Sequence, residues 1–535
     1  MNRKPYRIGV IDLGSNTARL IVMQAIPGYA YRIVDEIREV VRLQQGMTKK
    51  GLHKKAVERA FSTLRLFKRF CDTTHVDTIL TTATAAVRDA PNGPAFIERV
   101  SAEINLDLQI IDGEREAYLG VLGVLNEVPF EEGYVLDIGG GSAQTSEVRK
   151  SFFHKGQSFT LGALALTERF VAHDPIKASE VKNIQKEIDH QLDTAFWAKK
   201  IHAPTLVGLG GTIRNLARIA CLRHDYPLNT LHGVRLTRAD VEKTIDLLRH
   251  NSNAKRKHIP GLNEDRADII LPGAMVVATV MDRLGVEDMA ISTCGLREGV
   301  FLEQFWEHLP RPTVPEIKRF GVLNLARNYH YQKHHTNHVR FLCERLFDQL
   351  SPLHGYGLPE LELLDAAAML HDIGNAIGYD DHHKHSQTLI QYNGLPGFTP
   401  REIALIALLT RFHRKGKPNI LDYKTLLDKD DEKLLLCLSA LLRLAEFLER
   451  GRNAAVDDVS VTWTDDTLHI SLIADEFPIV EMWQSEQHAV PLARAAFDRK
   501  VRLDSLAAPG PWPGLSEDDD DENNTETFPP PAPST

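Results

Sequence analysis

The strongest constraint on the fold of this chain is a turn that occurs twice. Residues 12–17 read Asp-Leu-Gly-Ser-Asn-Thr, residues 137–142 read Asp-Ile-Gly-Gly-Gly-Ser, and each stretch follows a short apolar run. Apolar runs that end at glycine predict strands followed by tight turns. Glycine also allows the backbone angles and close approach with which amides cradle an anion. The repeat therefore predicts two related α/β halves, each opening on a phosphate-type turn.

The rest of the first 305 residues alternates strand-like and helix-like patterns. Residues 53–71 carry apolar side chains at helical spacing, and residues 77–82 form an apolar run typical of a strand. A second set begins at Tyr134. The chain therefore predicts one α/β lobe over 1–125 and another over 126–305. Further strands are expected at 7–13, 18–23, 134–138 and 204–208, and further helices at 175–200 and 238–250.

A proline-containing break at 308–317 suits a linker, and the pattern beyond it is different. Apolar residues recur there every three or four positions, which predicts an all-α domain over 306–455. In residues 456–473 apolar and polar side chains alternate, which predicts a hairpin. This hairpin would belong to a small α+β region over 456–510. The tail, 511–535, is acidic and rich in proline and is expected to be disordered. Helices are expected at 316–329, 336–350, 359–372, 400–412 and 433–449, with His382, His383 and His385 in a connection.

Charge and hydropathy exclude several classes of protein. Seven acidic residues within 517–526 account for most of the formal net charge of −9, so the body of the chain is close to neutral. A neutral body does not favour bulk nucleic-acid binding, and an anionic ligand would need local cations and backbone donors. No apolar stretch approaches the roughly 20 residues of a membrane span, and no signal-peptide pattern precedes the first strand. We expect a cytoplasmic protein without membrane or specific nucleic-acid partners.

A third glycine-rich turn, residues 208–212, follows a strand-like run and precedes a helix-like one. A helix that begins there would add amide donors and a favourable dipole for an anion. In the two earlier turns, Asp12 and Asp137 can hold a divalent cation that bridges to phosphate oxygens. Together the three turns predict a site for phosphate groups.

Six motifs follow one another along the chain: D-L-G-S-N-T (12–17), A-T-A-A-V-R-D-A (83–90), D-G-E-R-E-A (112–117), D-I-G-G-G-S (137–142), G-L-G-G-T (208–212) and C-G-L-R-E-G (294–299). In this order they resemble the motifs of exopolyphosphatases and guanosine pentaphosphate phosphohydrolases, the Ppx/GppA family. The resemblance implies a fold of the actin/Hsp70/sugar-kinase type, with two ribonuclease-H-like lobes and a cleft between them. Here an all-α HD-like domain, a small β hairpin and a disordered acidic tail would follow.

The same resemblance implies roles for individual residues. Glu116 would be the catalytic carboxylate that positions or activates the attacking water, with Glu114 as the competing candidate. Phosphoryl transfer needs little beyond an aligned nucleophile and neutralised charge. Asp12 and Asp137 would hold Mg²⁺, and the guanidinium group of Arg88 would donate bidentate hydrogen bonds to phosphate oxygens. The other residues expected to bind the substrate are Gly14, Ser15, Asn16, Thr17, Gly139, Gly140, Gly141, Ser142, Gly210, Gly211 and Thr212.

Two details qualify this assignment. Where the family commonly has Gly-Gly-Gly-Ser-Thr-Glu, this chain has Ala143 and Gln144 after the serine. A glutamine neither binds Mg²⁺ as a carboxylate does nor acts as a base, so metal affinity or substrate preference can differ. Arg297 and Glu298 also match a family motif and are interpreted as structural.

The helical region carries a second group of metal-ligating residue types. His335, the pair His371-Asp372 and a later acidic residue resemble an HD-type domain, in which such side chains converge on a metal. The fourth position holds Glu446, where HD enzymes typically place aspartate. Because glutamate is one methylene longer, we do not expect an intact metal site there, and we expect a helical scaffold without hydrolase activity of its own.

Two basic stretches in this region match family motifs. They contain His383 and Lys384, and Arg414 and Lys415. A long polyanion needs cations distributed along its path and gains binding free energy from counterion release. We therefore expect these four residues to bind the substrate beyond the cleft.

The sequence predicts Mg²⁺-dependent removal of terminal phosphate from inorganic polyphosphate. The alternatives are hydrolysis of the 5′ γ-phosphate of guanosine pentaphosphate and, on the same fold, a small sugar or acetate kinase. An alternative of another class is a polyphosphate- or alarmone-binding regulator without turnover. The family resemblance further implies a homodimer.

Overall fold

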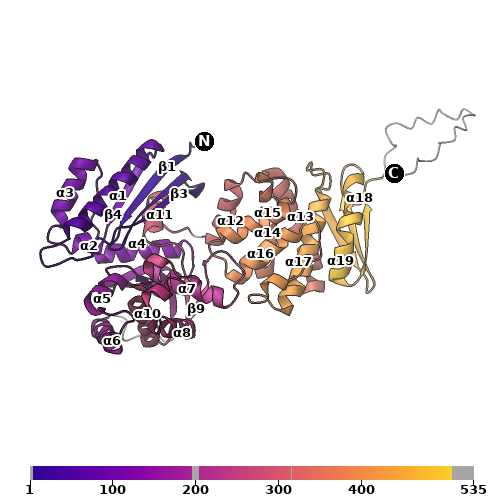
Figure 1. Cartoon of the computed structure of the whole chain (residues 1–535). Helices are drawn as coiled ribbons and strands as arrows, with labels where there is room; N and C mark the ends of the chain where they lie inside the picture. Colours follow the sequence, from indigo (N-terminus) through magenta and orange to yellow (C-terminus); the bar gives the residue numbers. More distant parts are fainter. Residues whose placement is uncertain (1–3, 196–203, 315, 509–535) are drawn as a thin grey trace, which may run out of the picture.

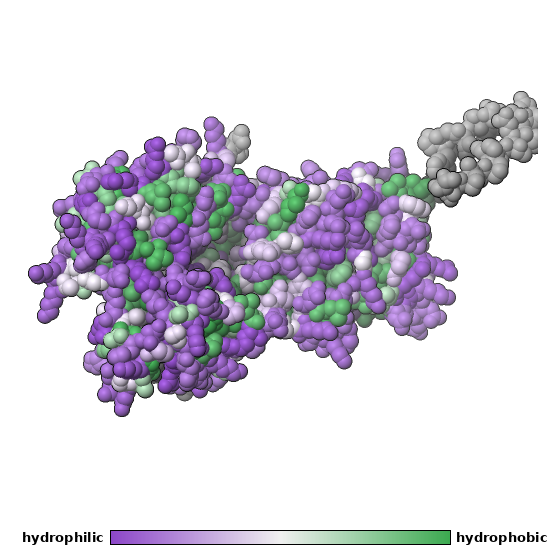
Figure 2. Space-filling view, in the orientation of Figure 1, coloured by the Kyte–Doolittle hydropathy of each residue, from purple (hydrophilic) through white to green (hydrophobic). Residues whose placement is uncertain are grey.

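The computed structural model describes residues 4–195, 204–314 and 316–508. Two α/β lobes lie one above the other at one end of an elongated molecule, and a helical domain follows with a small sheet at the far end (Figure 1). No helix among these residues combines the length and apolar character needed to cross a bilayer. The face in Figure 2 is mostly hydrophilic, with scattered apolar patches. The expected tail, 511–535, and the end of the expected helix 175–200 lie outside the described residues.

The first lobe is built on a four-stranded sheet in the order β3-β2-β1-β4. Strands β1 and β2 form a hairpin, and its register sets Asp12 opposite Arg19. Strand β4 runs parallel to β1 on the other side. Side chains of β1 enter apolar clusters on both faces of the sheet, which explains its nearly continuous apolar sequence. The strands are β1 (Tyr6–Leu13), β2 (Thr17–Ile26), β3 (Ala30–Val40) and β4 (Thr78–Ala83).

The second lobe repeats this arrangement. Its sheet has the order β7-β6-β5-β8-β10-β9, so an antiparallel meander again lies beside a parallel strand. The repeat confirms the prediction of two related α/β halves. The strands are β5 (Gly133–Ile138), β6 (Ala143–Arg149), β7 (Phe152–Phe159), β8 (Thr205–Leu209), β9 (Arg235–Thr237) and β10 (Asp288–Ile291).

Two helices cross between the lobes, which corrects the predicted boundaries at 125 and 305. Helix α4 (Gly113–Leu125) precedes the second sheet but packs on it, because Val121 and Val124 join the cluster of Val135. Helix α11 (Leu296–Phe305) follows the second sheet but packs on the first, where Phe301 joins the cluster of Ile8. The apolar side chains of each helix fit the opposite sheet, and the chain order does not reveal that exchange.

The remaining helices of the lobes cover their own sheets. Helices α1 (Lys54–Thr73), α2 (Ala85–Arg88) and α3 (Gly93–Ile104) contribute to the core of the first lobe. The second lobe has α5 (Ala163–Phe170), α6 (Ala178–Leu192), α7 (Gly210–Arg223), α8 (Arg238–Arg249), α9 (Asn253–Arg256), a short 3₁₀ turn at Glu264–Arg266 and α10 (Ile270–Leu284).

The helical domain contains the five predicted helices and one that was missed. Helix α15 (His382–Asn393) occupies the stretch predicted as a connection. Its buried positions include His382, His383 and Ser386, so the apolar period that marks a helix is absent. The predicted helices are α12 (Ile317–Asn328), α13 (Lys333–His354), α14 (Leu358–Leu370), α16 (Pro400–Phe412) and α17 (Lys429–Leu448), with 3₁₀ turns at Ile373–Ala376 and Leu421–Tyr423.

The predicted hairpin is present, but residues 456–508 do not form a core of their own. Leu468 and Val501 belong to the same apolar cluster as Leu441 of α17, so the predicted boundary at 455 does not separate two cores. A third strand, which the sequence did not reveal, pairs in parallel with the hairpin. The elements are β11 (Asp458–Trp463), β12 (Thr467–Ile473), α18 (Ile479–His488), α19 (Val490–Phe497) and β13 (Lys500–Ser505).

Candidate active site

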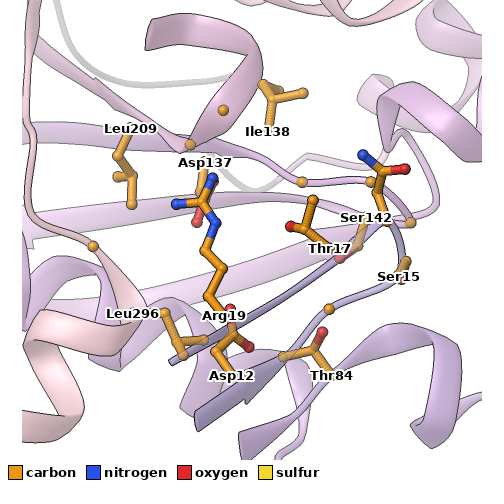
Figure 3. A pocket seen from close by; sticks show the side chains of 18 of the residues that line it. Asp12, Ser15, Thr17, Arg19, Thr84, Asp137, Ile138, Ser142, Leu209 and Leu296 are labelled. Carbon is orange, nitrogen blue, oxygen red and sulfur yellow. The ribbon is translucent and has the colours of Figure 1, made fainter. Parts of the chain in front are cut away.

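A polar cleft lies where the turns after β1 and β5 face each other, and the turn between β8 and α7 contributes to its wall. Figure 3 shows Arg19 extending between Asp12 and Asp137, with Ser15, Thr17 and Ser142 grouped beside it. The cleft is lined by Asp12, Gly14, Ser15, Asn16, Thr17, Arg19, Thr84, Glu116, Asp137, Ile138, Gly139, Gly140, Gly141, Ser142, Leu209, Gly210, Gly211, Arg214, Arg266, Gly295, Leu296, Arg297 and Glu298.

The two aspartate turns touch each other at glycines. A Cβ atom on Gly140 would lie 2.8 Å from Cβ of Asn16, and one on Gly141 would lie 2.3 Å from Oγ of Ser15. Side chains cannot replace these glycines without moving the turns, so the backbone itself forms the wall. The amide of Asn16 is buried, and neither its nitrogen nor its oxygen meets a hydrogen-bonding partner within 4–195, 204–314 and 316–508. It remains available to a ligand in the cleft.

The strand ends bring two carboxylates into the cleft. Burial raises the pKa of Asp12, and nearby arginines, Arg297 first, oppose the rise. Burial also raises the pKa of Asp137 to about 6; Arg214 lowers it and the charge of Asp12 raises it further. Two buried carboxylates that repel one another favour a cation between or beside them.

Glu116, in the first turn of α4, is the third carboxylate. Burial raises the pKa of Glu116 to about 7, although Arg88 pulls it down; the charges of Asp137 and Asp12 add to the rise. A guanidinium nitrogen of Arg88 lies 3.0 Å from Oε2 of Glu116 and holds it in place. Glu114 is exposed and does not line the cleft. The geometry therefore favours Glu116 over Glu114 as the carboxylate that can accept a proton near neutral pH.

Replacing Arg88 by methionine should move the acid limb of the pH profile. The substitution removes the cation beside Glu116, so the pKa of that carboxyl rises and Glu116 ionises only at higher pH. We expect the acid limb of kcat/KM, which reports the free protein, to shift upward by about one pH unit or more. The measurement is phosphate release at each pH with Arg88→Met and wild type. If the acid limb of the profile did not move, Glu116 would not be the group whose ionisation sets it.

Buried and half-buried arginines complete the wall, and the sequence did not single out three of them. Burial, with the charges of Arg297, Arg214 and Arg266 among others, lowers the pKa of Arg19 to about 9. Burial likewise lowers the pKa of Arg266 to about 10 and that of Arg214. These guanidinium groups repel one another, and an anion of several charges would relieve that repulsion.

Arg297 and Glu298 lie in the cleft wall and also tie elements together, as the structural interpretation predicts. Arg297 on α11 pairs with Glu36 of β3 at 2.7 Å and with Glu298 at 3.3 Å. Glu298 in turn accepts a hydrogen bond from the amide of Gly295 at 2.8 Å. Both therefore fix the wall on which the other arginines stand.

Comparison with known proteins identifies the family. The sequence model of the Ppx/GppA phosphatase family matches residues 21–308, more than half of the chain. The chain belongs to the Ppx/GppA phosphatase family. Residues 317–484 match domain III of Ppx/GppA phosphatases, so the family extends through most of the helical region.

Solved structures of Ppx/GppA relatives agree with this. An exopolyphosphatase from Cytophaga hutchinsonii is 29% identical, with 58% of this chain and 100% of that chain covered and a TM-score of 0.52. An exopolyphosphatase-like protein is 25% identical, with 56% and 98% covered and a TM-score of 0.51. The Ppx/GppA family member of Aquifex aeolicus is 28% identical, with 58% and 100% covered and a TM-score of 0.49.

Most of the residues expected to bind phosphate in this Ppx/GppA protein line the cleft, and two do not. Thr212 is fully buried, and its side chain faces Gly273 rather than the cleft. Arg88 lies behind Glu116, where it also donates to the carbonyl of Ile111 at 3.1 Å. Whether the lining residues contact phosphate stays a prediction. Gly14, Ser15, Asn16, Thr17, Gly139, Gly140, Gly141, Ser142, Gly210 and Gly211 line the cleft.

Gln144, where this chain departs from the family pattern, supports the second turn from behind. Its amide nitrogen donates to Oγ of Ser142 at 2.7 Å and to Oγ of Ser158 at 3.2 Å. The side chain is buried and does not line the cleft. Its role in this structure is therefore to hold Ser142.

The basic residues expected along the substrate path lie on and beside α15, and one of them is misassigned. His383 is almost fully buried, and burial, together with Arg411 and Lys415, lowers its pKa to about 4, so its ring is neutral. It cannot serve as a surface cation. Lys384 and Lys415 both pair with Asp381, at 2.7 and 3.3 Å, whereas Arg414 donates to the hydroxyl of Tyr379.

Proposed function

We propose that this phosphatase removes terminal phosphate from inorganic polyphosphate with the help of Mg²⁺. The observation that carries the proposal is the wall of the cleft. Three arginines that repel one another, Arg266 buried and Arg19 and Arg214 half-buried, face glycine turns and a carboxylate with a pKa of about 7. Such a wall is suited to a substrate that brings several negative charges and needs one activated water.

The composition of the wall favours a chain of phosphates over a nucleotide. Among the described residues that line the cleft, none is aromatic, and the large apolar ones are Ile138, Leu209 and Leu296. A guanine base is usually held by stacking and by polar contacts to its edge. The turns and arginines offer contacts for phosphate groups instead. The exopolyphosphatase relative of Cytophaga hutchinsonii supports the same substrate.

The carboxylates fit a weakly caged Mg²⁺. Among the described residues, no three metal-ligating side chains of the cleft bring ligand atoms within 4.8 Å of one another. Mg²⁺ keeps several waters and is commonly bound by one or two carboxylates together with substrate phosphates. Asp12 and Asp137, whose pKa values burial raises, supply such carboxylates. When bound, Mg²⁺ would neutralise charge on the phosphate oxygens.

The residues of the chain then divide the work of hydrolysis. The amides of the glycine turns and the guanidinium groups of Arg19, Arg214 and Arg266 bind the terminal phosphoryl group and disperse its growing charge. Glu116 accepts a proton from the water that attacks phosphorus, and Arg88 keeps its carboxylate oriented. The shortened polyphosphate leaves from the opposite side of the phosphorus atom.

Phosphate release from long-chain polyphosphate and guanosine pentaphosphate, measured in parallel with Mg²⁺, tests the proposal. We expect polyphosphate to have the higher kcat/KM. A higher kcat/KM for the nucleotide would replace the proposed substrate. Tight polyphosphate binding without turnover of either substrate would instead indicate a regulator. Light scattering of the same protein tests the predicted homodimer.

The basic surface beside α15 should matter for long chains only. Replacing Arg414 and Lys415 by alanine removes two cations from the proposed path, so kcat/KM for long-chain polyphosphate should fall about tenfold. The slope of log(kcat/KM) against log salt concentration should become shallower by about one for each phosphate contact that is lost. Tripolyphosphate, which has only three phosphate groups, is the internal control. Equal effects on both lengths would place these residues outside the path.

A further inference from the structure

A second cluster of chemically active side chains lies in the helical domain, away from the cleft. Its members come from α13, α15, α16, α17 and the end of α14, and they are almost completely buried. Two overlapping groups within it bring ligand atoms within 4.8 Å of one another. The cluster consists of His335, His371, Asp372, His382, His413 and Glu446.

The first half of the cluster joins His335, His371 and Glu446. The two Nε2 atoms of the histidines lie 3.2 Å apart. Oε2 of Glu446 lies 3.3 Å from Nε2 of His335 and 3.1 Å from Nε2 of His371. The longer side chain of Glu446, which led us to expect a scaffold without hydrolase activity, therefore reaches both rings.

The second half joins His382 and His413 in the same manner. Their Nε2 atoms lie 3.3 Å apart. Ligand atoms of a tetrahedral site with metal–nitrogen bonds of about 2.0–2.1 Å lie about 3.3–3.4 Å apart. Both histidine pairs therefore have the spacing of two ligands on one ion.

The backbone fixes the orientation of three of the rings. In His371, His382 and His413, Nδ1 lies 2.7, 2.9 and 2.7 Å from the carbonyl oxygen of the residue three positions earlier. A carbonyl only accepts, so Nδ1 of each ring is the donor and Nε2 is the nitrogen that faces the cluster. Metal-binding histidines are commonly oriented by such a hydrogen bond from the other ring nitrogen.

Asp372 lies between the two halves. Its Oδ1 is 3.8 Å from Nε2 of His371, 3.2 Å from that of His382 and 3.9 Å from that of His413. Its Oδ2 is held by Arg452 at 2.7 Å. Asp372 is thus placed to be a ligand to both halves.

Two buried oxygens in the cluster lack hydrogen bonds. Oδ1 of Asp372 and Oε2 of Glu446 find no hydrogen-bonding partner among the described residues. A buried acceptor without a hydrogen bond is costly, and both oxygens face imidazole nitrogens of the cluster. Metal cations bound by the imidazole nitrogens and by these two carboxylate oxygens would give the oxygens the partners that they lack.

We propose that the helical domain binds two divalent transition-metal ions, with Asp372 as the shared ligand. His335, His371 and Glu446 complete one site, and His382 and His413 bind the other ion. Imidazole with carboxylate ligands selects ions such as Zn²⁺, Mn²⁺, Fe²⁺ or Co²⁺ over Mg²⁺. This centre is independent of the cleft and of the function proposed for it.

Co²⁺ titration of the full-length, metal-stripped protein in millimolar Mg²⁺ tests the proposal. Mg²⁺ saturates oxygen-rich sites such as the cleft, whereas cobalt bound to imidazole is followed by its visible absorption. We expect two ions per chain by elemental analysis and a higher thermal unfolding temperature with Co²⁺ than with chelator. One ion per chain or fewer in the wild type would overturn the two-ion centre.

Variants assign the two halves. His413→Ala should retain about one ion per chain, and Asp372→Asn should weaken both sites. His334→Ala, an exposed neighbour of His335 on the same helix, is the matched control and should keep two ions. Circular dichroism confirms that each variant is folded. A folded His413→Ala variant that still binds two ions would contradict the assignment.

Discussion

Glu116→Gln should lower kcat for phosphate release by about 10²–10⁴-fold, the usual contribution of a positioned general base. The substitution keeps the size of the side chain and an oxygen that can accept from Arg88, which lies 3.0 Å away. It removes the group that takes the proton from water. Because the loss concerns the chemical step, KM should change much less than kcat. Steady-state phosphate release across substrate concentrations separates the two.

Glu114→Gln is the matched control for this experiment. Glu114 is exposed on the same helix turn and does not line the cleft, so its replacement should leave kcat within about twofold of the wild type. Stability gives a second check. Burial raises the pKa of Glu116 to about 7. Ionisation of this carboxyl therefore destabilises the folded state as the pH rises through 7. Glu116→Gln should therefore not lower the unfolding temperature above pH 7. Equal activity in both variants would exclude Glu116 as the base.

The turns that carry the cleft could be predicted because their signal is local. Strand, aspartate and glycine follow one another in the sequence around Asp12 and Asp137. Arg19 was missed although a signal exists. With a turn at residues 14–16, the hairpin register places residue 19 opposite residue 12, on the same face of the sheet. Arg214 and Arg266 offered no such signal, because their approach to the cleft depends on how helices pack.

The same limit explains the errors in the helical domain and at the lobe boundaries. The buried face of α15 is polar, so its sequence lacks the apolar period of a helix. His382 and His413 join the cluster of the helical domain only because α15 packs on α16, whereas their sequence stretches indicated a basic surface for the substrate. The exchange of α4 and α11 between the sheets is likewise a matter of packing. Local patterns fix elements, whereas contacts distant in sequence decide which elements share a site.

Arg19 is the residue through which the cleft most directly favours a polyanion. It lies between the aspartates in Figure 3, and burial together with neighbouring arginines lowers its pKa to about 9. No hydrogen bond or ion pair holds its guanidinium group within the described ranges 4–195, 204–314 and 316–508. Its positive charge therefore destabilises the ligand-free protein slightly, whereas the proposed function expects it to stabilise a bound phosphate, so its two effects would be opposite in sign.

Arg19→Gln should consequently weaken function without weakening the fold. Loss of a charged hydrogen bond costs about 1.5–3 kcal/mol, so kcat/KM for polyphosphate should fall by about 10- to 150-fold. The unfolding temperature in phosphate-free buffer should be equal to or above that of the wild type, because repulsion among the arginines is reduced. The stabilisation that added polyphosphate gives the wild type should largely disappear. Arg32→Gln, an exposed arginine on β3, is the control and should change neither quantity. If Arg19→Gln unfolded at a lower temperature while polyphosphate still stabilised it fully, Arg19 would be a structural residue, and the anion would be held by Arg214 and Arg266 alone.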